Sequence, residues 1–211
     1  MTKRIITISR QYGSGGREIG RLVAEKLGVP YYDRNLVNHV AEESGFSREF
    51  IEQSGEHAST TSSLLFNIAN SAFGQGLMMG AGGDPLSLSD RVFVAQSNVI
   101  TKLAEQGPCV IVGRCADYVL RDREDCLNVL IHANDDFRED RIVSLYGEDP
   151  IKAKKTLKQR DDKRKVHYKH YTGMPWGLAE NYHLTLDSSL IGVETCADMI
   201  VACIRAAEKS K

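Results

Sequence analysis

The chain has 211 residues, of which 27 are Lys or Arg and 28 are Asp or Glu, so its formal net charge is −1. This near balance gives no overall field that would attract nucleic acid or an acidic lipid surface. Hydrophobic residues make up 42% and charged residues 26%, which excludes a disordered or collagen-like chain and predicts one compact folded domain.

The sequence gives no sign of export or of a membrane partner. No apolar run approaches the roughly 20 residues that cross a bilayer, and the amino end, MTKRIITISRQ, becomes polar before a signal-like segment forms. The five cysteines are an odd number without a CxxC pair, which argues against a disulfide framework and against a zinc knuckle. These features predict a soluble protein in a reducing cytoplasm.

Short β-branched and apolar runs alternate with helical and loop segments along the chain. The first run, at 4–9, precedes a glycine-rich stretch and then a helix that the apolar spacing predicts up to Leu27. Further strands are predicted at 29–33, 109–113, 127–133 and 182–187. Each predicted strand is separated from the next by helical or loop material. This order of elements predicts an α/β fold with a five-stranded parallel sheet.

Two segments depart from this alternation within the single predicted domain, 1–211. Residues 36–90 contain predicted helices and then five glycines within 74–83, which predict either a mobile loop over a ligand or an ordinary surface connection. Residues 150–178 contain a basic helix. From Lys152 to His170 there are seven lysines and two arginines against two aspartates, a local net charge of +7 that the neutral average hides.

The stretch SRQYGSGGREIG lies where the first strand passes to the first helix. Backbone N–H groups and the positive end of a helix converge on an anion at such a turn. Gly13, Gly15 and Gly16 allow a phosphate to approach the backbone closely, and Arg17 adds a positive charge beside them. The stretch therefore predicts phosphate binding, with a tight turn that needs glycine for helix packing as the weaker alternative.

Two known nucleotide-binding patterns match this stretch incompletely. The dinucleotide-binding pattern fails because Glu18 stands where its third glycine belongs. The pattern G-x-x-x-x-G-K-[ST], with Arg17 as its lysine, has Gln11 for the first glycine and Glu18 for the hydroxyl residue. The predicted phosphate loop is Gly13–Glu18 and includes Ser14.

The opening ITISRQYGSGGREIG, followed by VAEKLGVPYYD, resembles the cytidylate kinase-like family of P-loop nucleoside monophosphate kinases. The resemblance implies a three-layer α/β/α P-loop NTPase-like fold, ATP and Mg²⁺ as cofactors, and residues 36–90 and 150–178 as acceptor-binding insertion and lid. In the register set by AEKLG, Gly16 takes the place of the loop lysine. A shift by one residue brings Arg17 there, and we predict that Arg17 takes the lysine's role with the β- and γ-phosphates.

The resemblance also implies positions for other arginines of the site. Arg114 in VGRCADY matches the arginine that holds the acceptor's phosphate, with Cys115 in place of the family's aspartate. Arg138 matches an arginine that a helix carries toward the active site. Arg160 and Arg164 are the predicted lid arginines, which close over the transferring phosphoryl group and exclude water.

Several acidic residues fit more than one role. Asp33 and Arg34 follow the second predicted strand and are candidate acceptor-binding residues, although an aspartate in such a loop is also a common helix cap. Glu18 has two open roles, as a magnesium ligand or as an acid that favours the positive helix end. The six histidines show no HExxH spacing, so a metallohydrolase is disfavoured and no residue is assigned as a metal ligand.

The sequence therefore predicts an ATP-dependent phosphotransferase acting on a nucleoside monophosphate or a related small acceptor. The missing Lys-[ST] pair keeps one alternative open, a nucleotide-binding regulatory protein without transfer activity. A nucleic-acid-binding module using the +7 segment is disfavoured because that segment has no interleaved aromatic platform. The oligomeric state is open, with a homodimer among the options.

Overall fold

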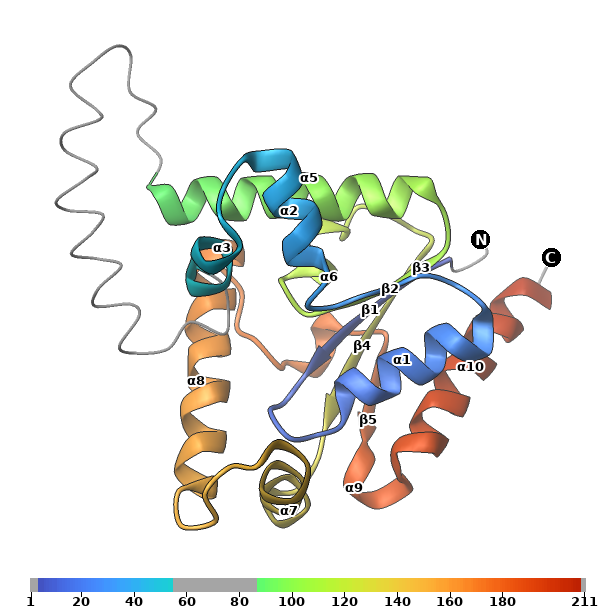
Figure 1. The fold of residues 1–211 in the computed structure, drawn as a ribbon. Coiled ribbons are helices and arrows are strands. Elements are labelled where there is room, and N and C mark those ends of the chain that lie inside the picture. Colours follow the sequence, from blue (N-terminus) through green and yellow to red (C-terminus); the bar gives the residue numbers. More distant parts are fainter. Residues whose placement is uncertain (1–3, 55–86, 210–211) are drawn as a thin grey trace, which may run out of the picture. The chain divides into compact units, whose positions relative to one another are not determined.

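The computed structural model describes residues 4–54 and 87–209 (Figure 1). The chain groups into two compact units, one made of residues 1–33 and 100–211 and the other of residues 34–99. The glycines at 74–83, for which the sequence predicts a loop, lie outside the described residues.

The first unit is built on a five-stranded parallel sheet with the order β2-β3-β1-β4-β5. The central strand β1 (Ile5–Arg10) pairs with β3 (Cys109–Val112) and with β4 (Cys126–His132). The edge strands are β2 (Tyr31–Tyr32) and β5 (Leu184–Asp187). This confirms the predicted five-stranded α/β sheet.

Strand β2 is shorter than the predicted strand at 29–33. The carbonyl of Pro30 accepts a hydrogen bond from the Val110 N–H at 2.9 Å, but proline has no N–H to donate in return. The regular strand therefore begins only after Pro30.

One face of the sheet is covered by α1 (Gly16–Leu27) and α10 (Val193–Lys209), which lie side by side (Figure 1). The main apolar core lies beneath these two helices and includes Ile6 and Ile8 of β1. Alternate residues of a strand point to opposite faces of its sheet, so Arg10 leaves β1 on the same face as Ile6 and Ile8.

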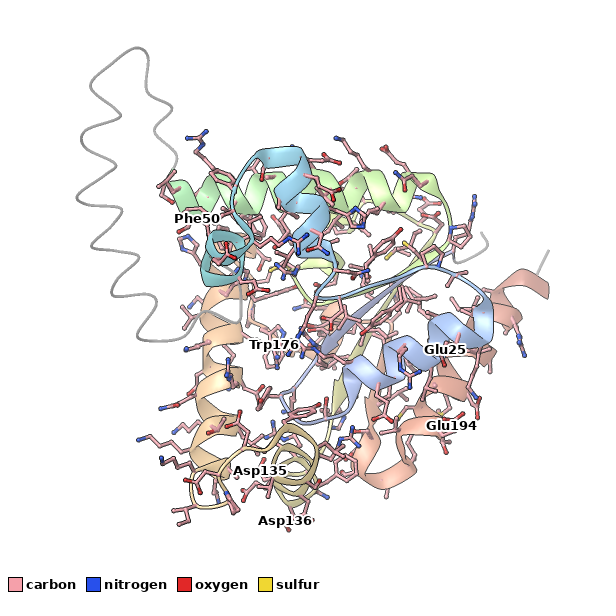
Figure 2. The ribbon with its side chains drawn as sticks, in the orientation of Figure 1. Glu25, Phe50, Asp135, Asp136, Trp176 and Glu194 are labelled. Atoms are coloured by element: carbon pink, nitrogen blue, oxygen red, sulfur yellow. The ribbon has the colours of Figure 1, made fainter. Side chains whose placement is uncertain are left out.

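The opposite face carries more polar side chains. Thr7 donates to Asn128 Oδ1 at 2.7 Å, and both residues are buried. Trp176, labelled in Figure 2, donates from Nε1 to the Ser9 hydroxyl oxygen at 2.9 Å. Each of these polar groups thus has a hydrogen-bond partner, as burial requires.

The remaining elements of the first unit follow the strands in chain order. They are α6 (Ala116–Val119), α7 (Asp135–Tyr146), α8 (Ala153–Thr172), a short 3-10 helix (Ala179–Asn181) and α9 (Ser188–Ile191). The basic segment of the sequence forms α8, whose lysines are exposed or half-exposed while Leu157 packs against Ile142 of α7. Long lysine side chains thus lie on the outer face of α8, and the inner face is apolar or paired.

The second unit contains α2 (Leu36–Ser44), α3 (Arg48–Ser54) and the first part of α5 (Leu88–Gln106). Its buried apolar residues include Leu36, Val40, Ile51 and Val92. Within residues 4–54 and 87–209, no helix is both long enough and apolar enough to cross a membrane.

Candidate phosphate-binding site

The glycine-rich loop joins the carboxyl end of β1 to the start of α1. Gly13 and Gly15 have φ angles of +80° and +78°, a region that residues with a Cβ rarely adopt. Gly15 caps α1, and its carbonyl accepts the first helical hydrogen bond, from the Ile19 N–H at 2.9 Å. The amides of residues 15–18 have no acceptor within the helix and lie at its positive end. The backbone here has the geometry of an anion site.

The loop also packs tightly against its neighbours. A Cβ on Gly13 would lie 2.8 Å from the Arg138 carbonyl oxygen, and one on Gly16 would lie 2.5 Å from Arg10 Cβ. Helix packing, the weaker alternative of the sequence analysis, therefore accounts for glycine at both positions. Glycine content alone does not distinguish packing from phosphate binding, so the surrounding charges carry the argument for an anion.

Ser14 is fully buried within the loop. Its hydroxyl donates to the Gln11 carbonyl at 2.9 Å and lies 3.3 Å from the Ile131 carbonyl, while its own carbonyl accepts from the Ser188 hydroxyl at 2.7 Å. The hydroxyl of Ser14 thus faces the protein interior. Any contact between Ser14 and a phosphate would involve its backbone.

A small pocket opens at the loop, bounded by residues 10–13 and 15–17 together with Tyr146 and Arg164. Arg10 and Arg164 are 3% and 4% exposed, whereas Arg17 is half-buried. Arg17 Nε lies 3.0 Å from Asp33 Oδ2, so two residues that the sequence places in different parts of the site form an ion pair. Three arginines and no Asp or Glu are among the residues that line this pocket, a composition that suits a polyphosphate ligand.

Arg138 and Arg164 meet at the carboxylate of Asp161 in α8. Arg138 Nη1 lies 2.6 Å from Asp161 Oδ2, and Arg164 Nη1 lies 3.3 Å from Asp161 Oδ1. The Tyr12 N–H donates to Asp161 Oδ1 at 2.8 Å, and Arg164 also donates to the Arg10 carbonyl at 2.9 Å. Asp161 and both arginines are less than 10% exposed. This buried cluster connects α7 and α8 to the loop.

Asp161 was not predicted from the sequence. Its spacing of three residues from Arg164 on one helix was a readable signal, but its contact with Arg138 depends on the packing of α8 against α7. Arg160, the other predicted lid arginine, is half-buried, with its guanidinium carbon 5.5 Å from the centre of the Tyr12 ring. The pKa of the Tyr12 hydroxyl is raised. Burial is the main cause, and the hydrogen bond that the hydroxyl donates to Glu148 is the second.

Glu18 contacts an arginine, since Arg141 Nη2 lies 2.7 Å from Glu18 Oε2. The Asp, Glu, His and Cys residues that the structure describes form no group of three or more able to hold a metal ion. Mg²⁺ usually binds through one or two carboxylates, several waters and substrate phosphates. A magnesium ion held mainly by phosphate oxygens and water does not require such a group.

The candidate acceptor-binding arginines lie apart in the chain. Arg114 and Cys115 follow β3 with φ angles of +58° and +54°, a strained turn for residues with side chains. Arg114 is 6% exposed, and Cys115 Sγ lies 3.7 Å from His167 Nδ1. Arg34 is exposed and belongs to the second unit, where its carbonyl accepts from the Val37 N–H at 3.1 Å.

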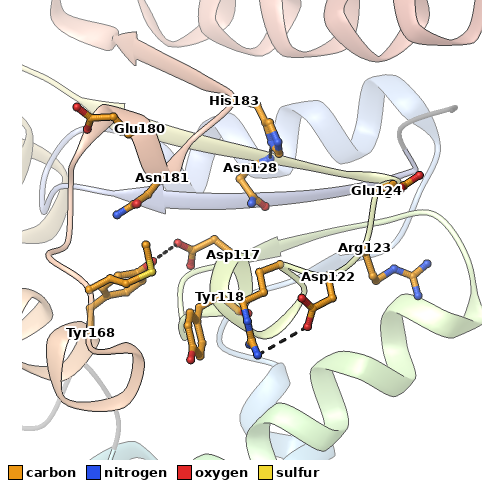
Figure 3. A pocket seen from close by; sticks show the side chains of 12 residues that line it. Asp117, Tyr118, Asp122, Arg123, Glu124, Asn128, Tyr168, Glu180, Asn181 and His183 are labelled. Carbon is orange, nitrogen blue, oxygen red and sulfur yellow. Dashed lines mark hydrogen bonds and ion pairs between the residues drawn. The ribbon is translucent and has the colours of Figure 1, made fainter.

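A second pocket of about 400 Å³, which the sequence does not predict, lies in the first unit (Figure 3). Asp117, Tyr118, Tyr168 and His183 are among its lining residues. The Tyr168 hydroxyl donates to Asp117 Oδ2 at 2.8 Å. Burial and the nearby Asp117 carboxylate raise the pKa of Tyr168.

The parallel sheet, with a glycine-rich loop between its central strand and α1, has the α/β fold that P-loop kinases share. Residues 5–190 match the cytidylate kinase-like family, and the chain belongs to that family. The resemblance stated from the opening motif is thereby confirmed.

Solved structures agree with this fold. An uncharacterized protein from Eubacterium ventriosum has a TM-score of 0.69 and 25% identity, over 95% of this chain and 98% of that chain. Shikimate kinase from Bacteroides thetaiotaomicron has a TM-score of 0.52 and 14% identity, over 95% and 98%. A gluconokinase from Sinorhizobium meliloti has a TM-score of 0.53 and 16% identity, over 99% and 95%. The two kinases show the fold alone, and no curated protein sequence matches the chain.

Proposed function

We propose that the protein is an ATP-dependent phosphotransferase that binds the phosphates of ATP at Gly13–Glu18. One observation carries this proposal: the first-turn amides of α1 and several buried or half-buried guanidinium groups surround the same small pocket. Membership of the cytidylate kinase-like family supports transfer of the nucleotide-kinase type.

Phosphoryl transfer needs mainly positioning and neutralisation of charge, because little covalent chemistry is left to the protein. The loop amides would hold phosphate oxygens, with Arg17 beside them. Arg138 and Arg164, fixed by Asp161, and Arg160, beside Tyr12, would face the transferring phosphoryl group. Mg²⁺ would arrive with ATP and neutralise part of its charge.

The acceptor we propose is a nucleoside monophosphate or a related small molecule, held by Arg114, Asp33 and Arg34. Arg114 follows β3, which pairs in parallel with β1, so Arg114 and the phosphate loop lie at the same edge of the sheet. Ligands of open parallel sheets bind outside the carboxyl ends of the strands. This location supports the proposal that Arg114 binds the phosphate of an acceptor.

A regulatory protein that binds nucleotide without transferring phosphate is the second candidate. Three observations favour it: the Lys-[ST] pair is missing, the Ser14 hydroxyl faces the interior, and Glu18 is paired with Arg141. Both candidate functions include binding of a nucleotide, and only the phosphotransferase transfers phosphate.

The decisive assay follows phosphate from γ-labelled ATP and Mg²⁺ to a panel of nucleoside monophosphates and nucleosides, with ATP binding recorded on the same preparation. Transfer to one acceptor establishes the kinase and identifies its substrate. Binding without transfer to any acceptor favours the regulatory protein. Absence of ATP binding contradicts both candidates.

Substitution of Arg17 tests the loop directly. We expect Arg17→Ala to weaken ATP binding and to lower the free energy of unfolding by no more than about 1 kcal/mol, because its ion pair with Asp33 is partly solvated. Calorimetric titration with ATP and urea unfolding measure the two effects. Unchanged affinity in the folded variant would remove Arg17 from the site.

A further inference from the structure

Arg10 is the last residue of β1, and sequence patterns gave it no role. Its side chain leaves the strand on the face that α1 covers and is 3% exposed. Arg10 lines the same pocket as Gly13, Gly15 and Gly16. The side chain of Arg10 therefore passes beneath the start of α1, and Arg10 forms part of the wall of the proposed phosphate site.

Gly16 and Arg10 fit each other closely. A Cβ on Gly16 would lie 2.5 Å from Arg10 Cβ and 2.9 Å from Arg10 Cγ. Gly16 is the first residue of α1, and its φ is outside the left-handed region that Gly13 and Gly15 occupy. Glycine is needed at position 16 for space rather than for backbone conformation, and Arg10 fills that space.

The two positions are also related in the sequence pattern. In G-x-x-x-x-G-K-[ST] with Gly15 as the second glycine, position 10 takes the first glycine and position 16 takes the lysine. This chain has arginine at position 10 and glycine at position 16. In this register the cation is thus missing from position 16 and present at position 10, and the two positions touch.

We propose that Arg10 supplies the positive charge that the P-loop lysine supplies in the complete pattern, and that it binds the phosphates of ATP. Arginine at the strand end and glycine at the helix start form one exchange, because a side chain at position 10 requires glycine at position 16. This inference rests on the proposed function and assigns the phosphate-binding cation within it.

The test measures binding of Mg²⁺-ATP and of inorganic tripolyphosphate to the full chain by calorimetry. The variants are Arg10→Ala, Gly16→Lys and the double variant Arg10→Gly/Gly16→Lys. Arg21→Ala is the matched control, because Arg21 also belongs to α1 but is exposed and paired with Glu25. Thermal melting followed by circular dichroism reports whether each variant is folded.

Arg10→Ala should weaken the binding of both ligands by about tenfold or more, since it removes a charge-assisted hydrogen bond to the phosphates. The control should bind like the wild type. Gly16→Lys should lose binding and thermal stability, because its side chain overlaps Arg10. The double variant removes the overlap and returns the cation to position 16, so it should bind more tightly than Gly16→Lys and melt at a higher temperature.

A folded Arg10→Ala protein that binds both ligands like the wild type would overturn the proposal. If Arg10→Ala does not fold, the double variant decides, and affinity no better than that of Gly16→Lys would overturn it. A wild-type protein that binds neither ligand contradicts the proposed function itself, before any variant is compared.

Discussion

The carboxylate of Asp161 lies between the guanidinium groups of Arg138 and Arg164 and accepts the Tyr12 N–H. All three charged side chains are buried, so each has lost most of its hydration. A buried charge whose partner is removed costs far more than an exposed one. The position of Arg164, which lines the phosphate pocket, therefore depends on Asp161, whereas Arg138 pairs with Asp135 as well.

Asp161→Ala should lower the free energy of unfolding by about 3–5 kcal/mol, because it leaves two buried arginines without their shared carboxylate. Asp162→Ala is the matched control: Asp162 is half-exposed and lies 3.4 Å from Lys165 Nζ, so its loss should cost less than about 1 kcal/mol. Urea unfolding of both variants makes the comparison. Equal stabilities would show that the buried cluster contributes little.

The five cysteines should differ sharply in reactivity. Cys203 is exposed and the other four are buried. Burial raises the pKa of both Cys109 and Cys196 from 9.0 to about 11, so these thiols stay protonated near pH 8. The stability that their neutral form contributes is present below pH 9.0 and is lost as pH rises through about 11.

At pH 8 a thiol reagent should therefore modify one cysteine rapidly in the folded chain and all five after unfolding. Mass spectrometry should locate the rapid modification at Cys203, and Cys203→Ser should abolish it. Rapid modification of Cys109 in the folded chain would contradict the burial of its thiol.

Among the elements, the phosphate loop combines two demands on glycine. Gly13→Ala would place a methyl group 2.8 Å from the Arg138 carbonyl oxygen at a φ of +80°. Gly28, at the end of α1, also has a positive φ, of +65°, but a methyl group there would meet no atom within 4 Å. The two glycines thus share a conformational requirement and differ in packing.

Gly28→Ala should cost about 1–2 kcal/mol of unfolding free energy, which is the penalty for the left-handed conformation alone. Gly13→Ala should cost more and should also weaken ATP binding, because the loop must move away from α7. Denaturant unfolding and ATP titration measure both effects. Equal costs for the two variants would mean that the loop adjusts to a methyl group without strain.

The elements themselves were predictable where their signals are local. The β-branched run of β1, the glycine loop and the apolar spacing of α1 lie next to one another in the sequence, and the structure contains each. The close approaches of Gly13 to Arg138 and of Gly16 to Arg10 were not predictable, because they depend on how separate elements pack. Arg138 and Arg164 were predicted from the sequence as site residues, but their shared ion pair with the Asp161 carboxylate was not.

For the molecule as a whole, the sequence predicts one domain, and the structure groups the chain into two compact units. The sheet, the phosphate loop and the arginines 10, 17, 114, 138, 160 and 164 all belong to the first unit. The residues that we propose for phosphate binding at the loop therefore all belong to the first unit. The acceptor-binding role of residues 36–90 and closure of α8 as a lid stay predictions.

The central claim is that the loop at the start of α1 binds the phosphates of ATP. Backbone amide shifts in a heteronuclear NMR spectrum, recorded as Mg²⁺ and a non-hydrolysable ATP analogue are added, test it most directly. The largest changes should fall on the amides of residues 12–18. Changes concentrated on residues that line the second pocket, such as Asp117 and His183, or no changes at all, would contradict the claim.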